Sequence, residues 1–351
     1  MSRYWSELVK TLTPYVPGEQ PQQAGLVKLN TNESPYPPSP AVMAAVAETS
    51  NDSLRRYPDP QCVELRSVFA QQHGLSLDQV FVGNGSDEVL ALTFLALLKH
   101  DRPLYFPDIT YSFYHVWAQL CQIEYRTVPL AKDFTVPSTA FPADSGGVIL
   151  PNPNAPTGIF LPLPQVRTLL GRCRGAVVVI DEAYVDFGGE SATSLIDEFD
   201  NLLVIQTLSK SRSLAGLRVG FAAGQPHLIE ALDRVKNSFN SYPVDAIAQR
   251  AATAALRDDV YYQGCIERIV SARTVLETQL RELGFAVLPS AANFLMVTHP
   301  ERSAEALFDH LRQHNVLVRY FDKPRIDGYL RISVGTPDEC EAVIAALRLL
   351  S

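Results

Sequence analysis

The run Ala176-Val177-Val178-Val179-Ile180 is apolar at every position. A strand of this kind has no polar face to turn toward solvent, which is typical of a parallel sheet covered by helices on both sides. Leu202-Leu203-Val204-Ile205 repeats the pattern, and shorter candidate strands lie at 79–82, 103–106 and 147–150. Helical segments separate these runs. The alternation predicts an α/β domain with a mostly parallel central sheet flanked by helices.

The pattern changes after about residue 235. Candidate helices cover 246–256, 262–283, 304–314 and 337–350, and candidate strands cover 294–297, 316–318 and 329–334. This order predicts a smaller α+β C-terminal domain. Before residue 30, several prolines and a glycine interrupt regular structure. We therefore expect an N-terminal arm (1–30), a large domain (31–240) and a small domain (241–351).

Composition narrows the class of protein. The 351 residues are 46% hydrophobic, enough for a large core, and the net charge of -8 argues against a nucleic-acid binder. The apolar stretch from Val89 to Leu98 is shorter than the roughly 20 residues that a membrane helix needs. The N-terminus lacks a secretory pattern, and five scattered cysteines suggest free thiols in a reducing cytoplasm. Neither the cysteines nor the histidines show metal-ligand spacing, so we expect no metal site. Because no apolar stretch is long enough, we also expect no membrane contact.

Four polar segments each begin where a predicted strand ends: 83–88, 151–158, 181–187 and 207–220. Carboxyl ends of parallel strands are where α/β proteins place ligands. The segment Gly83-Asn84-Gly85-Ser86-Asp87-Glu88 leads into a helix, whose free backbone N–H groups form an anion site. Taken alone, such a segment is more often a simple helix cap.

The other three segments add different chemistry. Asp181 can pair with a protonated ring nitrogen, although a capping or solvated carboxylate is an equal alternative. Lys210 can form a Schiff base with an aldehyde cofactor, and Ser209 and Arg218 can hold a phosphate; the alternative is a polar surface loop. The proline-rich segment 151–158 fixes a rigid turn, with or without chemistry. Together the four segments supply what a pyridoxal phosphate site requires.

With these motifs in order, the chain resembles the fold-type I pyridoxal-phosphate enzymes and, within their class II subfamily, the histidinol-phosphate aminotransferases. The resemblance covers nearly the whole length. Besides the four segments above, it rests on the motifs Tyr15-Val16-Pro17-Gly18, Leu29-Asn30-Thr31-Asn32-Glu33-Ser34-Pro35, Arg56-Tyr57-Pro58-Asp59, Thr110-Tyr111-Ser112 and Leu330-Arg331-Ile332-Ser333-Val334-Gly335. It implies pyridoxal 5'-phosphate as cofactor and transamination of L-histidinol phosphate with 2-oxoglutarate, giving imidazole acetol phosphate and L-glutamate in L-histidine biosynthesis.

The resemblance also implies residue roles. Lys210 would be the catalytic residue, carrying the cofactor and then shuttling a proton between it and the substrate α-carbon. The ring would be held through its nitrogen, its hydroxyl oxygen and its face by Asp181, Tyr184 and Tyr111. The cofactor phosphate would be surrounded by Ser86, Asp87, Ser209 and Arg218, with Tyr57 from a second subunit. Substrate would be bound by Tyr15, Asn32, Arg319 and Arg331.

Three expectations need comment. The family usually has asparagine directly before Pro-Thr-Gly, where this chain has Ala155; Asn154 substitutes if the loop is shifted. Strand alternation places Arg331 on the face opposite Leu330 and Ile332, either in an interdomain cleft or simply in solvent. The enzyme is expected to be a cytoplasmic homodimer with Tyr57 and Tyr15 contributed across the interface.

Other functions remain to be separated. An aromatic-amino-acid aminotransferase or a threonine-phosphate decarboxylase of the same fold would keep the cofactor but change the substrate. A ligand-sensing regulator would add a basic DNA-binding segment, for which the motifs starting by residue 15 leave no room. A serine hydrolase is not supported, because the chain has no Gly-x-Ser-x-Gly elbow.

Overall fold

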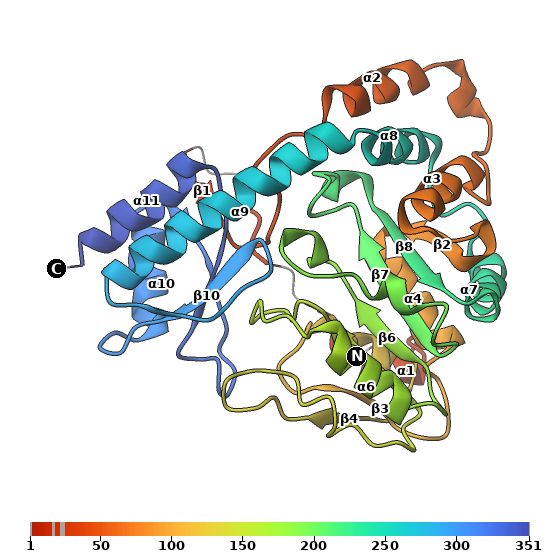
Figure 1. Cartoon of the computed structure of the whole chain (residues 1–351), viewed down its shortest axis with the longest axis horizontal. Helices are drawn as coiled ribbons and strands as arrows, with labels where there is room; N and C mark the ends of the chain where they lie inside the picture. The colour runs from red at the N-terminus through yellow and green to blue at the C-terminus, as the bar shows by residue number, and fades with distance from the viewer. Residues whose placement is uncertain (1, 16–17, 22–24, 351) are drawn as a thin grey trace.

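The computed structural model (Figure 1) describes residues 2–15, 18–21 and 25–350, so Val16 and Pro17 of the Tyr15–Gly18 motif lie outside the described residues. A large sheet and a smaller one lie in separate parts of the molecule, and the long helix α9 (Asp259–Glu282) runs from one part to the other. The expected combination of a large α/β part with a smaller α+β part is confirmed.

The seven-stranded sheet has the order β2-β8-β7-β6-β5-β3-β4. Its strands are β2 (Val80–Asn84), β3 (Leu104–Pro107), β4 (Tyr125–Val128), β5 (Gly147–Pro151), β6 (Val178–Asp181), β7 (Leu202–Thr207) and β8 (Val219–Gly224). As the apolar runs predict, β6 pairs in parallel with β5 and β7 and is buried throughout. The sequence pattern did not reveal β8, which is antiparallel to both neighbours, or the edge strand β4, which is largely exposed.

Helices cover both faces of this sheet. One face carries α4 (Gly85–Ala96), α5 (Phe113–Leu120) and α7 (Pro226–Phe239), whose apolar side chains join a core with Phe81, Val179 and Leu203. The other face carries α3 (Val63–His73), α6 (Leu163–Arg172) and α8 (Ala246–Arg257), which pack on Val178, Ile180 and other alternate residues. Further out, α2 (Pro40–Thr49) lies along α8.

The smaller sheet is antiparallel, with the order β12-β13-β10-β9. Its strands are β9 (Ala286–Val287), β10 (Phe294–Thr298), β12 (Arg319–Tyr320) and β13 (Leu330–Ser333), and the helices α10 (Ala304–Gln313) and α11 (Pro337–Arg348) share its core with α9. Helix α9 begins three residues before its expected start because the Asp258 side chain caps it, accepting from the Tyr261 N–H. The buried alanines of α8 belong to the core of the large part, whereas the exact domain boundaries stay a prediction.

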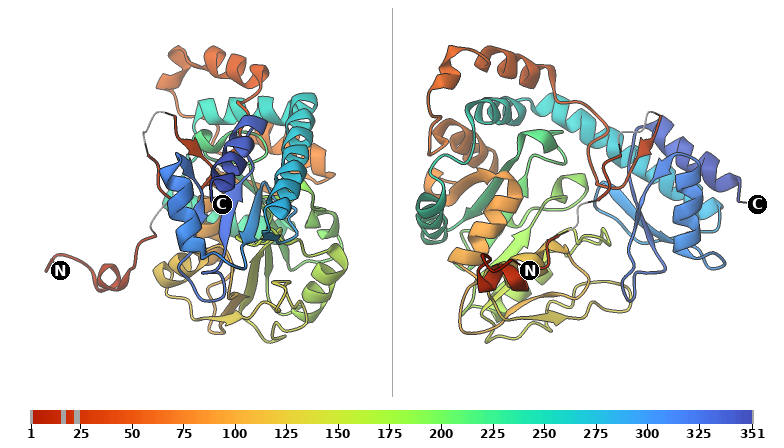
Figure 2. Two further views of the ribbon diagram at one scale, coloured as in Figure 1. Left: turned by 90° about the vertical axis from the view of Figure 1, so that its left-hand side faces the viewer. Right: turned by 180° about the vertical axis from the view of Figure 1, so that it is seen from behind.

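The chain before α2 contacts both parts. Short helix α1 (Glu7–Thr11) has no buried residue and projects outward, and β1 (Val27–Lys28) pairs in parallel with β11 (Val316–Leu317) of the small part (Figure 2). The residues that the structure describes also form the 3-10 helices η1 (Asp52–Arg55), η2 (Leu77–Gln79), η3 (Val185–Phe187), η4 (Ala192–Leu195) and η5 (Ala215–Leu217). In the part of the chain that the structure describes, no helix is both long and apolar enough to cross a bilayer.

Candidate active site

A cavity of about 490 Å³ lies where the carboxyl ends of β5, β6 and β7 face the small sheet. Every residue that the sequence predicted for the site lines this cavity, except Tyr57 and Asn154. The lining includes Tyr15, Asn32, Ser86, Asp87, Tyr111, Asp181, Tyr184, Ser209, Lys210, Arg218, Arg319 and Arg331. A larger hollow of about 830 Å³, bounded by α2, α3 and α8, contains none of them.

Asp181 forms the floor of the cavity because β6, whose last residue it is, runs through the middle of the sheet. Its Oδ2 accepts a hydrogen bond of 2.9 Å from the Tyr114 hydroxyl, and its Oδ1 accepts one of 3.3 Å from the Ala183 N–H. Burial raises the pKa of the Asp181 carboxyl to about 6, although the two hydrogen bonds oppose that change. A cationic partner in the cavity would offset the cost of this buried charge.

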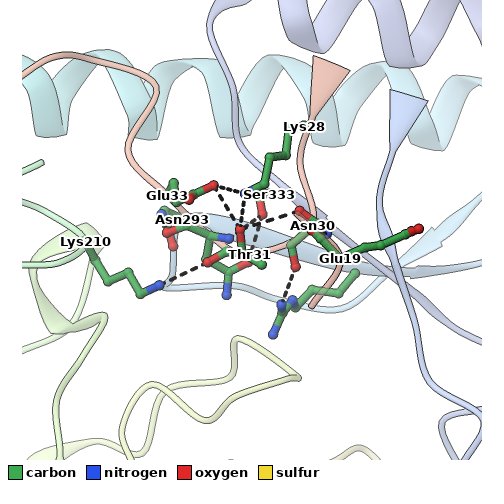
Figure 3. Close-up of polar contacts among 10 residues, drawn as sticks. Glu19, Lys28, Asn30, Thr31, Glu33, Lys210, Asn293 and Ser333 are labelled. Carbon is green, nitrogen blue, oxygen red and sulfur yellow. Dashed lines mark hydrogen bonds and ion pairs between the residues drawn. The ribbon is translucent and has the colours of Figure 1, made fainter. Parts of the chain in front are cut away.

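Lys210 follows β7 and extends across the cavity (Figure 3). Its Nζ donates a 3.0 Å hydrogen bond to the backbone carbonyl of Thr31 and lies 5.9 Å from the centre of the Tyr184 ring. Within the described residues no carboxylate lies within ion-pair distance of this amine. Its hydrogen bond goes to a neutral carbonyl, which leaves the amine available to a ligand.

The start of α4 and the end of β7 form a cationic corner. Arg218 Nη2 lies 2.8 Å from Asp87 Oδ2, and Arg218 Nη1 lies 3.5 Å from Ser209 Oγ. Gly85 has φ +77°, and a Cβ there would lie 2.5 Å from Arg218 Nη2. Glycine is therefore required where the helix N-terminus meets this arginine. With Ser86, the corner offers hydroxyls, backbone N–H groups and a guanidinium to an anion.

Arg319 and Arg331 occupy the opposite end on paired strands, in direct register with each other. Leu330 and Ile332 are buried in the small core, so strand alternation turns Arg331 into the cavity as the sequence predicted. Arg331 Nη2 donates to the Asn30 carbonyl at 2.9 Å, while its buried Nε has no hydrogen-bond partner. Burial lowers the pKa of this guanidinium. Neither arginine pairs with a carboxylate in the described part of the chain.

Three aromatic side chains form the walls. The Tyr111 hydroxyl donates to Asp87 Oδ1 at 3.2 Å, and burial raises the pKa of Tyr111. The Tyr184 hydroxyl accepts from Asn32 Nδ2 at 3.0 Å. Tyr15 packs on Phe113, with 4.8 Å between ring centres, and lines the cavity of its own chain. This placement differs from the expectation that Tyr15 serves a partner's site.

Two predicted residues lie outside the cavity. Asn154 Nδ2 donates to the Ile109 carbonyl at 3.2 Å and to Thr157 Oγ1 at 3.0 Å, whereas its buried Oδ1 has no hydrogen-bond partner. Ala155 lines the cavity instead. Tyr57 is 82% exposed and stacks on Tyr242, with 4.6 Å between ring centres. An exposed aromatic pair of this kind is available to a second subunit.

Sequence reasoning missed residues that hold the predicted ones. The Tyr114 hydroxyl donates a hydrogen bond to Asp181, and the Thr31 backbone carbonyl accepts one from Lys210. Ser333 Oγ accepts one from the backbone N–H of Asn32. The only available signal for Tyr114 was its spacing from Tyr111, one helical turn away. The contacts of Thr31 and Ser333 join segments about 180 and 300 residues apart, which no local pattern reveals.

One cavity at the edge of a mostly parallel sheet is lined by a lysine amine, a buried carboxylate and a group of anion-binding donors. This combination defines the class of protein. The model of the family "Aminotransferase class I and II" matches residues 24–347. The chain belongs to this family.

Its relatives narrow the family further. A histidinol-phosphate aminotransferase 2 of Dechloromonas aromatica is 58% identical and covers 100% of both chains, and a histidinol-phosphate aminotransferase 1 of Hydrogenovibrio crunogenus is 54% identical over 99% of this chain and 98% of its own. The structure of histidinol-phosphate aminotransferase from Sinorhizobium meliloti in complex with pyridoxal-5'-phosphate has a TM-score of 0.89 at 25% identity, covering 100% and 99% of the two chains. Within the aminotransferases, the chain groups with the histidinol-phosphate aminotransferases.

Proposed function

We propose that this chain transfers an amino group between L-histidinol phosphate and 2-oxoglutarate, giving imidazole acetol phosphate and L-glutamate, the transamination of L-histidine biosynthesis. Full-length relatives at 54–58% identity bear the name of this activity. The observation that carries the proposal is one cavity holding both a lysine amine near a buried carboxylate and two arginines without a carboxylate partner among the described residues.

The cofactor is pyridoxal 5'-phosphate, and the groups around the cavity fit each part of it. Lys210 offers an amine to the aldehyde, Asp181 offers a buried carboxylate to the ring nitrogen, and the Arg218 corner offers donors to the phosphate. When bound, the cofactor supplies an aldehyde for the substrate amine and a ring that delocalises the electron pair left at the α-carbon.

Lys210 has two tasks in this proposal. It would hold the cofactor covalently at rest. Once released, Lys210 Nζ would carry the proton that the substrate α-carbon loses and regains. The Thr31 carbonyl, 3.0 Å from Nζ, gives the released amine an acceptor within the same cavity. The amine therefore stays close to the reacting atoms.

The surrounding side chains orient the ring. Asp181 would keep a proton on the ring nitrogen, and the Tyr114 hydroxyl, at 2.9 Å, stabilises the carboxylate form that this task needs. Tyr184 would donate to the ring hydroxyl oxygen, and Tyr111 would cover one ring face. The phosphate would be held by Ser86, Asp87, Ser209 and Arg218.

Arg331, together with Arg319, binds the substrate anion. Both substrates are anionic, so one cation can serve the phosphate of histidinol phosphate and then a carboxylate of glutamate. A guanidinium presents a planar fork to either group. Asn32 and Tyr15 also line this end of the cavity. Arg331 Nε has no hydrogen-bond partner there among the described residues.

The active assembly is a homodimer in the cytoplasm, in which Tyr57 reaches the partner's cofactor phosphate. Tyr57, Phe239 and Tyr242 are exposed by 82%, 83% and 42%, although side chains of this kind are usually buried. Helix α1 projects from the chain without a buried residue. A second copy would cover these apolar side chains.

The decisive experiment compares amino transfer to 2-oxoglutarate from histidinol phosphate, phenylalanine and tyrosine by kcat/KM. Histidinol phosphate should be used best. A preference for phenylalanine or tyrosine would assign the chain to the aromatic-amino-acid aminotransferases. Release of carbon dioxide from O-phosphothreonine, without amino transfer, would assign it to the decarboxylases, one of which shares this fold at a TM-score of 0.79.

A further inference from the structure

A chain of hydrogen bonds connects strand β13 with Tyr184 through Asn32. Asn32 is 1% exposed and has a left-handed backbone, with φ +56°. Its backbone N–H donates to Ser333 Oγ at 2.9 Å, and Ser333 Oγ lies 2.8 Å from Asn32 Oδ1. Asn32 Nδ2 then lies 3.0 Å from the Tyr184 hydroxyl. The small and large parts of the molecule therefore meet in this chain of contacts.

The direction of these hydrogen bonds follows from the amide of Asn32. Its Oδ1 can only accept, so Ser333 Oγ, which accepts the Asn32 N–H, donates its own proton to Asn32 Oδ1. That contact turns the amide so that Nδ2, which can only donate, faces Tyr184. The Tyr184 oxygen accepts this bond, which leaves its own proton free to point into the cavity that Tyr184 lines.

The surroundings leave this arrangement little freedom. Asn293, fully buried, donates through Nδ2 to the Asn32 carbonyl at 3.0 Å, and Figure 3 shows Asn293 and Ser333 gathered around this segment. Phe294 meets the Tyr184 ring edge-on, with 5.1 Å between ring centres. Ala155, which packs with Phe294 and Tyr184, presents only a methyl group on this side of the cavity. No side-chain donor at residue 155 can share the task of Tyr184.

We propose that Ser333 is a positioning residue that, acting through Asn32, holds Tyr184 as a hydrogen-bond donor toward the cofactor's ring oxygen. The inference rests on the proposed cofactor site and adds to it a link from the substrate-binding strand, because Ser333 lies two residues from Arg331 on β13.

The test is a pH titration of the visible absorbance of the Lys210-linked cofactor in the intact enzyme. The titration follows loss of a proton from the Lys210-linked cofactor. A donor to the cofactor's ring hydroxyl oxygen stabilises the deprotonated form, so losing the donor should raise the midpoint pH. Tyr184→Phe should raise it by about 1–2 pH units, and Ser333→Ala by about half a unit. The matched control is Ser290→Ala, which removes a hydroxyl bonded to the Phe294 carbonyl outside the chain of contacts and should leave the midpoint unchanged.

A double-mutant cycle separates positioning from a general structural effect. In the Tyr184→Phe background, Ser333→Ala should shift the midpoint by less than about 0.2 unit. An undiminished shift in that background would overturn the proposal, as would no shift from Ser333→Ala alone. The same cycle with Asn32→Ala gives an independent route if Ser333→Ala does not fold. Failure of the proposed cofactor site looks different, because the wild-type protein would then show no lysine-linked absorbance at all. Failure of the proposed substrate would leave this titration unchanged and would appear only in the comparison of amino donors.

Discussion

The two cationic ends of the cavity differ in how their charge is balanced. At the phosphate end, Arg218 lies 2.8 Å from the Asp87 carboxylate and also contacts Ser209. At the substrate end, Arg319 and Arg331 face each other in register, and no carboxylate of the described chain pairs with either. Arg331 is half-buried, burial lowers its pKa, and its buried Nε has no hydrogen-bond partner.

The difference indicates which end binds the permanently held cofactor and which end binds the exchanging substrate. A balanced guanidinium holds its position before any ligand arrives. Two half-buried cations on paired strands are costly until an anion offsets them, so the substrate end gains most from a doubly charged ligand. The contrast favours a phosphate-bearing substrate over an aromatic amino acid, which offers only the single charge of its carboxylate.

Lys210 lies between the two ends, and its loss should have the largest effect. Lys210→Ala removes both the covalent link and the proton carrier, so turnover should fall by at least about 10⁴-fold. Borohydride reduction followed by peptide mapping should label Lys210 in the wild type and nothing in the variant. A label on another lysine would show that the cofactor is not linked to Lys210 and that the two ends of the cavity have been assigned wrongly.

Asp181→Asn should separate binding at the phosphate end from chemistry. Cofactor should still bind, because the Arg218 corner is intact, but a neutral amide stabilises the ring proton poorly. Proton abstraction, followed by exchange of the substrate α-hydrogen, should slow by about 10²–10³-fold. Near-normal exchange would assign Asp181 a structural role.

Arg331→Ala should damage the substrate end alone. Losing a charge-assisted contact to a buried anion costs about 2–5 kcal/mol in kcat/KM, for histidinol phosphate and glutamate alike. Arg331→Lys should recover only part of this loss because an ammonium lacks the planar fork. Arg348→Ala, which breaks an exposed pair with Glu341 on α11, is the control. Damage to one substrate only would point to Arg319 for the other, and loss of cofactor would contradict the division into two ends.

Glu182 gives a smaller effect, on stability, just behind the cavity floor. Its carboxyl accepts hydrogen bonds from Ser191, Ala192 and Gln206, yet burial raises its pKa from 4.5 to about 7. A raised pKa contributes stability below the unfolded value, and this contribution is lost as pH rises through about 7. Between pH 5.5 and 7.5, the wild type should therefore lose about 2 kcal/mol more unfolding free energy than Glu182→Gln. Urea denaturation of the wild type and of Glu182→Gln at both pH values measures these losses. Equal losses in the two proteins would show that Glu182 does not titrate in this range.

Local patterns predicted the strands with apolar runs better than the strands without them. The run ending at Ile180 was expected to be buried on both faces, and its strand, β6, is buried throughout. Strand β8 was missed because its small residues, Gly220, Ala222, Ala223 and Gly224, carry little strand signal. A Cβ at Gly220 would lie 2.3 Å from the Ser86 nitrogen, so the close approach that selects glycine is visible only in three dimensions.

The candidate site shows the same division. Residues at strand ends, such as Asp181 and Lys210, could be predicted because the sheet collects them at one edge. The resemblance to a family supplied Arg319 and also Arg331, whose strand alternation alone left it either in a cleft or in solvent. Neither source could find Tyr114 or Ser333, which act on other side chains through contacts distant in sequence.

The most direct measurement of the central claim compares histidinol phosphate with histidinol as amino donors, in the wild type and in Arg331→Ala. If the unbalanced arginines receive the substrate phosphate, the wild type should prefer the phosphorylated donor by about 10²-fold or more in kcat/KM. In Arg331→Ala this preference should fall to less than about a tenth of its wild-type value, since the two changes remove the same interaction. An equal preference in both proteins would mean that the phosphate is bound elsewhere and would contradict the account.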